Sequence, residues 1–510
     1  MRGIGVPMNE RSQRLKYNTI CALLYQVILV ITGLILPRLY LYYYGSAVNG
    51  VISSVKQFLA FINICDLGIS AVVTSAFYKP LGENDILKIS QILCYSKRLF
   101  RRIGYIMVGY IILLVIIYPM IVSGEFDYIF VITLIFSMSV AQLAQYFIGI
   151  SYQIMLNADQ RSYIQLIING GTLILNTILS IIIMVFGGTI QVVYFVSAVV
   201  YFLRPVLMMI YVKKNYKLNK NILIPKDVVK QKRNGIIQHI SYTIYENTDV
   251  LVLTILSTLQ NVSIYSIYTM VVGSIKSIIN AIFRGFESLF GNIIACDDKK
   301  TLTYLYDLYD WCIHSVSTLL YSVTGILIVP FVMLYTGNIN DADYYVPTFA
   351  MLITITFFLN TVRNAMFVMI RAAGHYKQTQ KCSIMEAIIN LGVSIMFVIH
   401  YGLIGVAVGT LISTTFSYLY LMIYLSKNIV CREKTKFIKQ IIVDVIFVCV
   451  IYITCSQFNL LCPSIWKWLG NAIIVTVIGS VELILIQGIF YKKNIVILID
   501  KIKSIIGRGN

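Results

Sequence analysis

Charged residues are scarce in this chain of 510 residues, in which Asp, Glu, Lys and Arg together make up only 12% while 58% of the residues are apolar. Acidic residues are the scarcer kind, with 22 Asp and Glu against 41 Lys and Arg. An average soluble domain carries about 25% charged residues, so this composition excludes a set of soluble domains. It indicates a membrane protein.

Motifs for metal binding and catalysis are also lacking. The ten cysteines and four histidines show no spacing typical of a metal site. The predicted outer loops are short, and Asp341 and Asp343 are the only paired acids in them. We therefore expect no metal, no cofactor and no enzymatic activity.

Long apolar runs recur along almost the whole sequence. A helix needs about 20 such residues to cross a hydrocarbon core ~30 Å thick. We predict an all-α polytopic membrane protein with about fourteen transmembrane helices. They are placed at Asn18–Leu36, Val51–Tyr78, Ile103–Val122, Tyr128–Ile150, Tyr163–Phe186, Ile190–Val212, Ile236–Leu259, Val262–Ile294, Cys312–Tyr335, Tyr345–Ile370, Ser383–His400, Gly402–Leu425, Phe437–Cys455 and Trp468–Phe490.

The basic residues fall in alternate loops. About 34 of the 41 lie in the amino tail, the even-numbered loops and the carboxyl tail, and only Arg38 and Lys467 lie in odd-numbered loops. This is the positive-inside pattern, which places both termini in the cytoplasm. The positive charge therefore indicates orientation and contact with anionic membrane lipids, and no nucleic-acid partner is expected.

The sequence repeats itself at an offset of 214 residues, which pairs Ala158 with Ala372, Asn176 with Asn390 and Gly188 with Gly402. Six helices per repeat predict two bundles of like orientation, as in transporters built from parallel repeats. The predicted divisions are a tail at 1–17, bundles at 18–213 and 236–427 joined by a basic linker at 214–235, two further helices at 428–491 and an amphipathic cytoplasmic tail at 492–510.

Several charges lie inside the predicted spans. Each costs about 2.5–3.5 kcal/mol at mid-bilayer, so each needs a partner, water or a function. Cationic residues on several helices of both halves indicate a hydrated cavity. The predicted cavity cations are Arg38, Lys56, Lys276, Arg284 and Arg363.

Acidic and histidine side chains accompany these cations. The predicted coupling or cavity acids are Asp66, His239, Glu246, Asp249, Glu287 and Glu386. The alternative is that the charges pair internally and only fix helix packing, for example Lys276 or Arg284 with Glu246 or Glu287. Arg204 can extend to the membrane surface, and Asp444 and Glu482 can pair with each other, so we leave these three outside the site.

The sequence resembles a known family over nearly the whole chain, through Leu36-Pro37-Arg38, Tyr44-Gly45, Asn49-Gly50-Val51 and Asp66-Leu67-Gly68-Ile69. These motifs are similar to those of Wzx-like polysaccharide repeat-unit flippases, in the multidrug/oligosaccharidyl-lipid/polysaccharide exporter (MOP) superfamily. The resemblance implies two six-helix bundles in a V shape and a cationic cavity, to which Arg38 carries over by motif. The other four cations carry over only by helix position.

The resemblance also implies a function. Such proteins move undecaprenyl-diphosphate-linked oligosaccharides by alternating access from the inner to the outer leaflet of the bacterial cytoplasmic membrane, for capsule, exopolysaccharide or O-antigen synthesis. The implied partners are this lipid-linked oligosaccharide, a polysaccharide polymerase and glycosyltransferases. Return of the empty carrier can use H+ or Na+, for which Glu246 and Asp249 are the candidates.

Two other functions stay open. A multidrug or cation antiporter of the same superfamily would share the architecture, but it would have an acidic or apolar cavity, which the surplus of Lys and Arg disfavours. A membrane polymerase or glycosyltransferase would need catalytic acids and a large outer loop.

Overall fold

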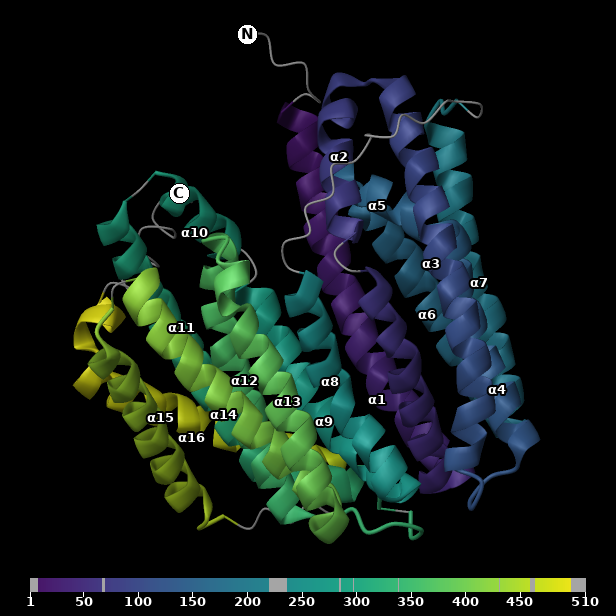
Figure 1. Cartoon of the computed structure of the whole chain (residues 1–510). Helices are drawn as coiled ribbons and strands as arrows, with labels where there is room; N and C mark the ends of the chain where they lie inside the picture. The colour runs from purple at the N-terminus through teal and green to yellow at the C-terminus, as the bar shows by residue number, and fades with distance from the viewer. Residues whose placement is uncertain are drawn as a thin grey trace. The chain divides into compact units, whose positions relative to one another are not determined.

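The computed structural model describes residues 8–66, 69–219, 236–283, 286–296, 298–337, 339–430, 432–458 and 464–496 (Figure 1). The chain forms two compact units, Met1–Ile255 and Leu256–Asn510. The first contains α1 (Met8–Ala60), the 3-10 helix η1 (Phe61–Asp66), α2 (Ile69–Glu83), α3 (Ile86–Ile121), α4 (Tyr128–Ala144), the π-helical turn η2 (Gln145–Gly149), α5 (Ile150–Ala158), α6 (Ser162–Val185), α7 (Ile190–Asn215) and α8 (Ile236–Leu256).

The second unit is helical throughout its described residues. It contains α9 (Leu259–Phe283), α10 (Phe286–Ala295), α11 (Lys299–Tyr335), α12 (Pro347–Ala372), α13 (Tyr376–Tyr401), α14 (Leu403–Asn428), α15 (Lys434–Cys455) and α16 (Ile465–Phe490).

The predicted all-α membrane architecture is confirmed. In the described part of the chain, twelve helices are long and apolar enough to cross a membrane. One of them, α1, consists of two helices divided at Gly45. The φ angle of this residue is 83°, which glycine adopts without strain. The predicted seventh span corresponds to α8, which carries Glu246 and Asp249 within its 21 residues.

Two helices begin well before their predicted spans, because capped polar turns extend them beyond the apolar run. α3 begins at Ile86, where Asp85 accepts a hydrogen bond from the backbone N–H of Lys88 at 3.0 Å. This bond lowers the pKa of Asp85. α11 begins at Lys299, capped in the same way by Asp298 on the N–H of Thr301.

Two predicted spans correspond to more than one helical element. The second includes the end of α1, the 3-10 helix η1 and α2, and the eighth includes α9 and α10. Because η1 is a 3-10 helix, Lys56 and Asp66 do not lie on one continuous α-helix.

The predicted duplication has matching helix ends. α5 ends at Ala158 and α12 at Ala372, and each is followed two residues later by a left-handed residue, Gln160 (φ 57°) or Gly374 (φ 70°). α6 and α13 then begin at positions 214 residues apart.

The duplicated asparagines also make equivalent contacts. Asn176 of α6 donates to the Tyr201 hydroxyl of α7 at 3.0 Å, and Asn390 of α13 donates to the Thr410 hydroxyl of α14 at 3.0 Å. Each asparagine thus joins the two helices of its hairpin.

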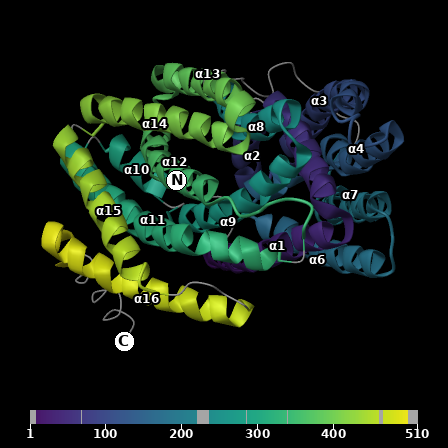
Figure 2. The same cartoon turned by 90° about the horizontal axis from the view of Figure 1, so that it is seen from below.

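The last two helices, α15 and α16, pack together against α11 along one edge of the second unit (Figure 2). Leu327, Phe447, Ile451 and Val475 belong to the apolar core shared by the three helices. The predicted appended pair is therefore built into this unit through α11.

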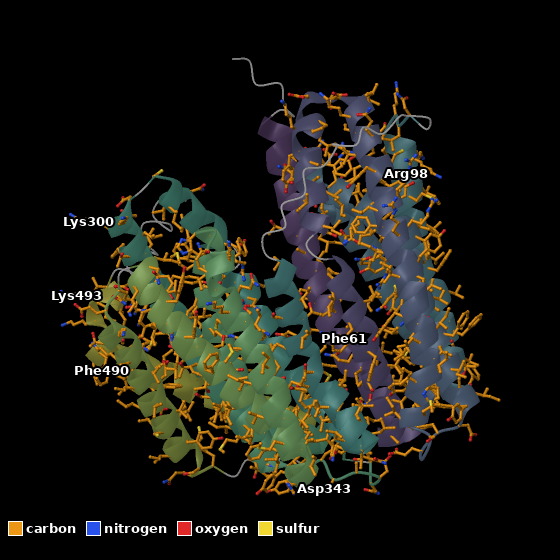
Figure 3. The ribbon with its side chains drawn as sticks, in the orientation of Figure 1. Phe61, Arg98, Lys300, Asp343, Phe490 and Lys493 are labelled. Carbon is orange, nitrogen blue, oxygen red and sulfur yellow. The ribbon has the colours of Figure 1, made fainter. Side chains whose placement is uncertain are left out.

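Three charged residues labelled in Figure 3 mark the ends of the second unit. Lys300 and Lys493 lie toward one end of the unit and Asp343 lies at the other (Figure 3). The location of both termini in the cytoplasm remains a prediction.

The close contact between α13 and α14 gives a stability prediction. A methyl group at Gly409 would lie 2.7 Å from the backbone nitrogen of Ser394, whereas one at Gly392 would meet nothing within 4 Å. We expect Gly409→Ala to destabilise the protein by about 1–3 kcal/mol. Thermal melting in detergent measures the effect, Gly392→Ala is the matched control, and equal melting temperatures for the two variants would contradict the packing described.

Candidate functional site

The first unit contains an open cavity of about 730 Å³, lined by both polar and apolar side chains. Helices α1, α4, α5, α6 and α7 and the turn η2 supply its walls. The volume lies within the range of small-molecule sites, about 300–1,000 Å³. Its polar and aromatic lining includes Tyr25, Thr32, Tyr40, Lys56, Ser137, Gln142, Gln145, Gln153, Gln165, Asn169, Asn176, Tyr194, Ser197, Tyr201 and Arg204.

Two cations line this cavity, and no Asp or Glu is among its described lining residues. Lys56 of α1 is exposed to it, with its Nζ 6.0 Å from the centre of the Tyr194 ring. Lys56 has no carboxylate partner among the residues whose side chains the structure describes. The cavity is therefore positively charged.

The second cation, Arg204 of α7, is held in place by its neighbours. Its Nε donates to the Thr172 hydroxyl at 2.7 Å, and its guanidinium lies 4.0 Å from the centre of the Tyr201 ring. Tyr201 in turn accepts from Asn176. Arg204 was expected to extend to the membrane surface, outside the site, whereas the structure places it in the wall of the cavity.

Six amide side chains complete the polar lining: Gln142, Gln145, Gln153, Gln165, Asn169 and Asn176. Gln145 donates to Gln153 at 2.5 Å. The carbonyl oxygens of Gln142 and Asn176 are buried and have no hydrogen-bond partner among the described residues. Amides offer both donors and acceptors, so this lining can bind hydroxyl groups while the two cations bind an anion.

The other predicted cavity cations lie elsewhere. Arg38 is exposed and is not part of the cavity lining. Lys276 belongs to the second unit, where its Nζ is 5.7 Å from the centre of the Phe357 ring. Arg284 and the side chains of Asp66 and His239 lie outside the described residues.

Arg363 and Glu386 are buried and form an ion pair between α12 and α13. They were predicted as a cavity cation and a cavity acid, with internal pairing as the alternative. The structure gives the paired arrangement. A buried pair of this kind satisfies two charges that hydrocarbon would not accept.

Glu287 of α10 is paired too, with Arg371 of α12 at 3.0 Å. The pair lines a smaller cavity of about 250 Å³ in the second unit, together with Asn280 and Asn364, which bond to each other at 3.0 Å. Arg371 lies in the last turn of α12 and was not among the predicted site residues.

The two acids of α8 differ in burial. Asp249 is buried, and Glu246 is exposed. The backbone oxygen of Glu246 accepts from Gln57 at 3.1 Å, and the Thr254 hydroxyl bonds to Ser54 at 2.7 Å, so α8 contacts the second part of α1. Ion coupling through the two acids remains a prediction.

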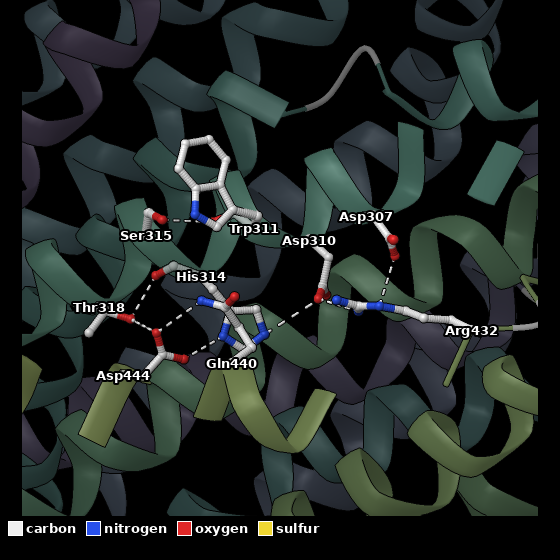
Figure 4. Close-up of polar contacts among 9 residues, drawn as sticks. All are labelled: Asp307, Asp310, Trp311, His314, Ser315, Thr318, Arg432, Gln440 and Asp444. Atoms are coloured by element: carbon white, nitrogen blue, oxygen red, sulfur yellow. Dashed lines mark hydrogen bonds and ion pairs between the residues drawn. The ribbon is translucent and has the colours of Figure 1, made fainter. Parts of the chain in front are cut away.

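A third cluster was missed by the sequence analysis. It joins α11 to α15 through Asp307, Asp310, His314, Arg432 and Asp444 (Figure 4). Asp444 bonds to His314, so the expected pairing of Asp444 with Glu482 is wrong. The missed signal was the spacing of 307, 310 and 314, which puts all three on one face of a helix that starts earlier than predicted.

Comparison with known proteins shows the fold. No protein-family model and no curated protein matches the sequence. A structure of the lipid II flippase MurJ, in an inward closed conformation, covers 94% of this chain and 99% of its own length at a TM-score of 0.65 and 15% identity.

Multidrug transporters have the same fold. An inward-facing MATE transporter of the MOP superfamily covers 79% of this chain and 94% of its own, at a TM-score of 0.53 and 16% identity. A mutant form of the Vibrio cholerae MATE transporter VcmN covers 83% of this chain and 99% of its own length, at a TM-score of 0.50 and 12% identity. The chain therefore shares the fold of membrane flippases and transporters.

The buried pair gives a prediction that separates structure from substrate binding. Arg363→Leu leaves Glu386 buried without this partner, so we expect a loss of about 3–5 kcal/mol of stability. Replacing both residues by Leu should restore most of it, as measured by thermal melting in detergent. A single variant that melts like the wild type would show that the pair does not hold the helices.

Proposed function

We propose that this protein is a flippase that moves undecaprenyl-diphosphate-linked oligosaccharides from the inner to the outer leaflet of a bacterial cytoplasmic membrane by alternating access. Such repeat units serve capsule, exopolysaccharide or O-antigen synthesis. The fold it shares with a lipid II flippase supports a lipid-borne cargo. A polymerase and glycosyltransferases are the expected neighbours in such synthesis.

The cavity of the first unit carries the proposal. It combines Lys56 and Arg204 with six amides and no described acid in its lining. A diphosphate is an anion with several acceptor oxygens, which Lys and Arg bind as charged donors. Sugar hydroxyls need both donors and acceptors, which the amides supply.

Physical chemistry explains why such a cargo needs a protein. Each hydroxyl without a hydrogen bond costs several kcal/mol in hydrocarbon, so an oligosaccharide requires a polar path. The diphosphate is the easier part, because moving about two negative charges outward gains about 4.6 kcal/mol per 100 mV of inside-negative potential. A fixed cationic site then suits capture at the inner leaflet.

A cation or multidrug antiporter is the second candidate, because the fold is also that of MATE transporters. A cationic drug would need a carboxylate or an apolar wall in its site. The cavity of the first unit has apolar lining residues but no described carboxylate, and its two cations favour an anionic cargo.

The remaining predicted residues keep their proposed roles. Arg38, Lys276 and Arg284 are proposed as further cations along the route of the diphosphate, and Glu246 and Asp249 as groups that bind a returning H+ or Na+. Glu246 is the exposed member of this acidic pair, so it can exchange an ion with water.

The cavity gives a prediction for export. A hydrogen bond from a charged donor contributes about 1.5–3 kcal/mol, so Lys56→Ala and Arg204→Ala should each weaken cargo binding by about 10- to 150-fold. Export of the polysaccharide from cells that depend on this protein should fall accordingly. Lys56→Arg keeps the charge and should retain part of the export.

The matched control is Lys79→Ala, which removes an exposed cation paired with Glu83 at 3.8 Å. Surface pairs contribute little, so export should not change. Equal export by wild type, Lys56→Ala and Arg204→Ala, at equal amounts of protein in the membrane, would overturn the assignment of the cavity.

A further inference from the structure

A line of ionisable side chains runs along one face of α11 and across to α15. Arg432 forms ion pairs with Asp307, through Nε at 2.8 Å, and with Asp310, through Nη1 at 2.5 Å. Beyond Asp310, the imidazole of His314 lies between two carboxylates, with Nδ1 2.5 Å from Asp444 and Nε2 3.8 Å from Asp310 (Figure 4).

Both ring nitrogens of His314 therefore face an acceptor. A neutral imidazole has only one N–H, so one of its nitrogens would turn a lone pair toward a carboxylate. Nε2 of His314 and Oδ1 of Asp310 are both buried and have no hydrogen-bond partner among the described residues, although they face each other. A second proton on the ring removes this conflict.

Charge balance leads to the same result. The described cluster contains three carboxylates, Asp307, Asp310 and Asp444, and two permanent cations, Arg432 and Lys436, which bonds to Asp307 at 3.0 Å. One negative charge is left over. Asp310 and His314 are at most 1% exposed, and an unbalanced buried charge is costly, so one proton held at His314 makes the cluster neutral.

The neighbouring helices supply no further charge in contact with His314 among the described residues. α12 presents the Phe358 ring, 6.3 Å from the imidazole between centres. α15 presents Gln440, which donates to Asp444 at 3.4 Å, and α16 presents Gln487, which bonds to Trp311. Among the described residues, the other titratable groups near the cluster are phenols: Tyr306 and Tyr309 of α11, Tyr418 of α14 and Tyr491 after α16.

We propose that His314, between Asp310 and Asp444, is a proton-binding site that fastens α15, and with it α16, to α11. The bound ligand is a proton, which converts the imidazole to an imidazolium that bridges the two carboxylates. In the described chain, no group of three His, Cys, Asp or Glu side chains could hold a metal ion instead.

Burial links proton exchange to movement. His314 and Asp444 are 1% and 3% exposed, so water reaches the proton only when α15 separates from α11. Because the separated state exposes the two acids to water, it holds the proton less tightly than the closed state. By linkage, a proton bound at this site favours the closed contact, and its loss at high pH favours opening.

The first test measures the proton directly and needs no cargo. His239, His375 and His400 are replaced by Gln, and the remaining 15N-labelled His314 is observed by solid-state NMR in liposomes. At neutral pH we expect both ring nitrogens of His314 to be protonated. In Asp444→Asn we expect one of the two to lose its proton. A neutral ring in the wild-type background at neutral pH would overturn the proposal.

If the triple replacement does not fold, the His314 signal is obtained as the difference between wild-type and His314→Gln spectra, with the same expected and contradicting results. Neither version depends on transport. A neutral His314 would therefore leave the proposed flippase function untouched.

The second test measures how the proton at His314 affects the stability of the contact between α15 and α11. The melting temperature of the wild type should shift downward as the pH rises from neutral to alkaline, while that of His314→Gln should not follow this shift. His375→Gln, which removes a bond to Tyr424, is the matched control and should behave as the wild type does. Identical pH profiles for wild type and His314→Gln would contradict the role of the proton.

Coupling of this site to transport rests on the proposed function. In proteoliposomes, a pH gradient should change the flipping rate of the wild type and leave that of His314→Gln unchanged. If flipping by the wild type and by His314→Gln responds equally to the gradient, His314 is not the coupling site. The proposed flippase function would then still stand. Absence of flipping in both would count against the flippase, and the NMR result would still decide the proton site.

Discussion

A charged side chain in the middle of a bilayer costs about 2.5–3.5 kcal/mol on insertion scales unless a partner or water meets it. This cost constrains the whole chain, because several Lys, Arg, Asp and Glu residues lie within helices long enough to span a membrane. In the second unit several charges meet partners: Arg363 with Glu386, Arg371 with Glu287, and Arg432 with two aspartates. In the first unit, Lys56 and Arg204 instead line an open cavity with no described acid in its lining.

These two arrangements suit different tasks. Paired charges fix helices against one another, because separating them would leave each partner uncompensated. Cations that line a cavity without acids remain available to an anion that enters from outside. The proposed proton site at His314 combines both features. Its imidazolium is a third cation beside Arg432 and Lys436, it balances the charge of the cluster, and it can be lost when the proton leaves.

Much of the fold could be predicted from the sequence. The length of the apolar runs predicted the helices. The 214-residue offset predicted the two hairpins, α6–α7 and α13–α14, which follow helices that end at Ala158 and Ala372. The helix starts of α3 and α11 could not be predicted from hydropathy, because polar, capped turns continue a helix where the apolar run stops.

The site was harder to predict because pairing depends on packing. Lys56 was found, since an intramembrane lysine stands out in any apolar run, but Arg204 and the amides were not. Nothing in the sequence says that Arg363 meets Glu386 while Lys56 meets a cavity. The cluster at His314 joins α11 to a residue more than a hundred positions later, Asp444, and such a distant contact leaves no local pattern.

The most direct test of the account is a flipping assay with purified protein in liposomes. The substrate is an undecaprenyl-diphosphate-linked oligosaccharide placed in one leaflet, and the measurement is the fraction of sugar that a lectin reaches from the other side. The account predicts protein-dependent transfer of the sugar and no transport of a cationic dye by the same liposomes. Transport of the dye without transfer of the sugar would contradict it.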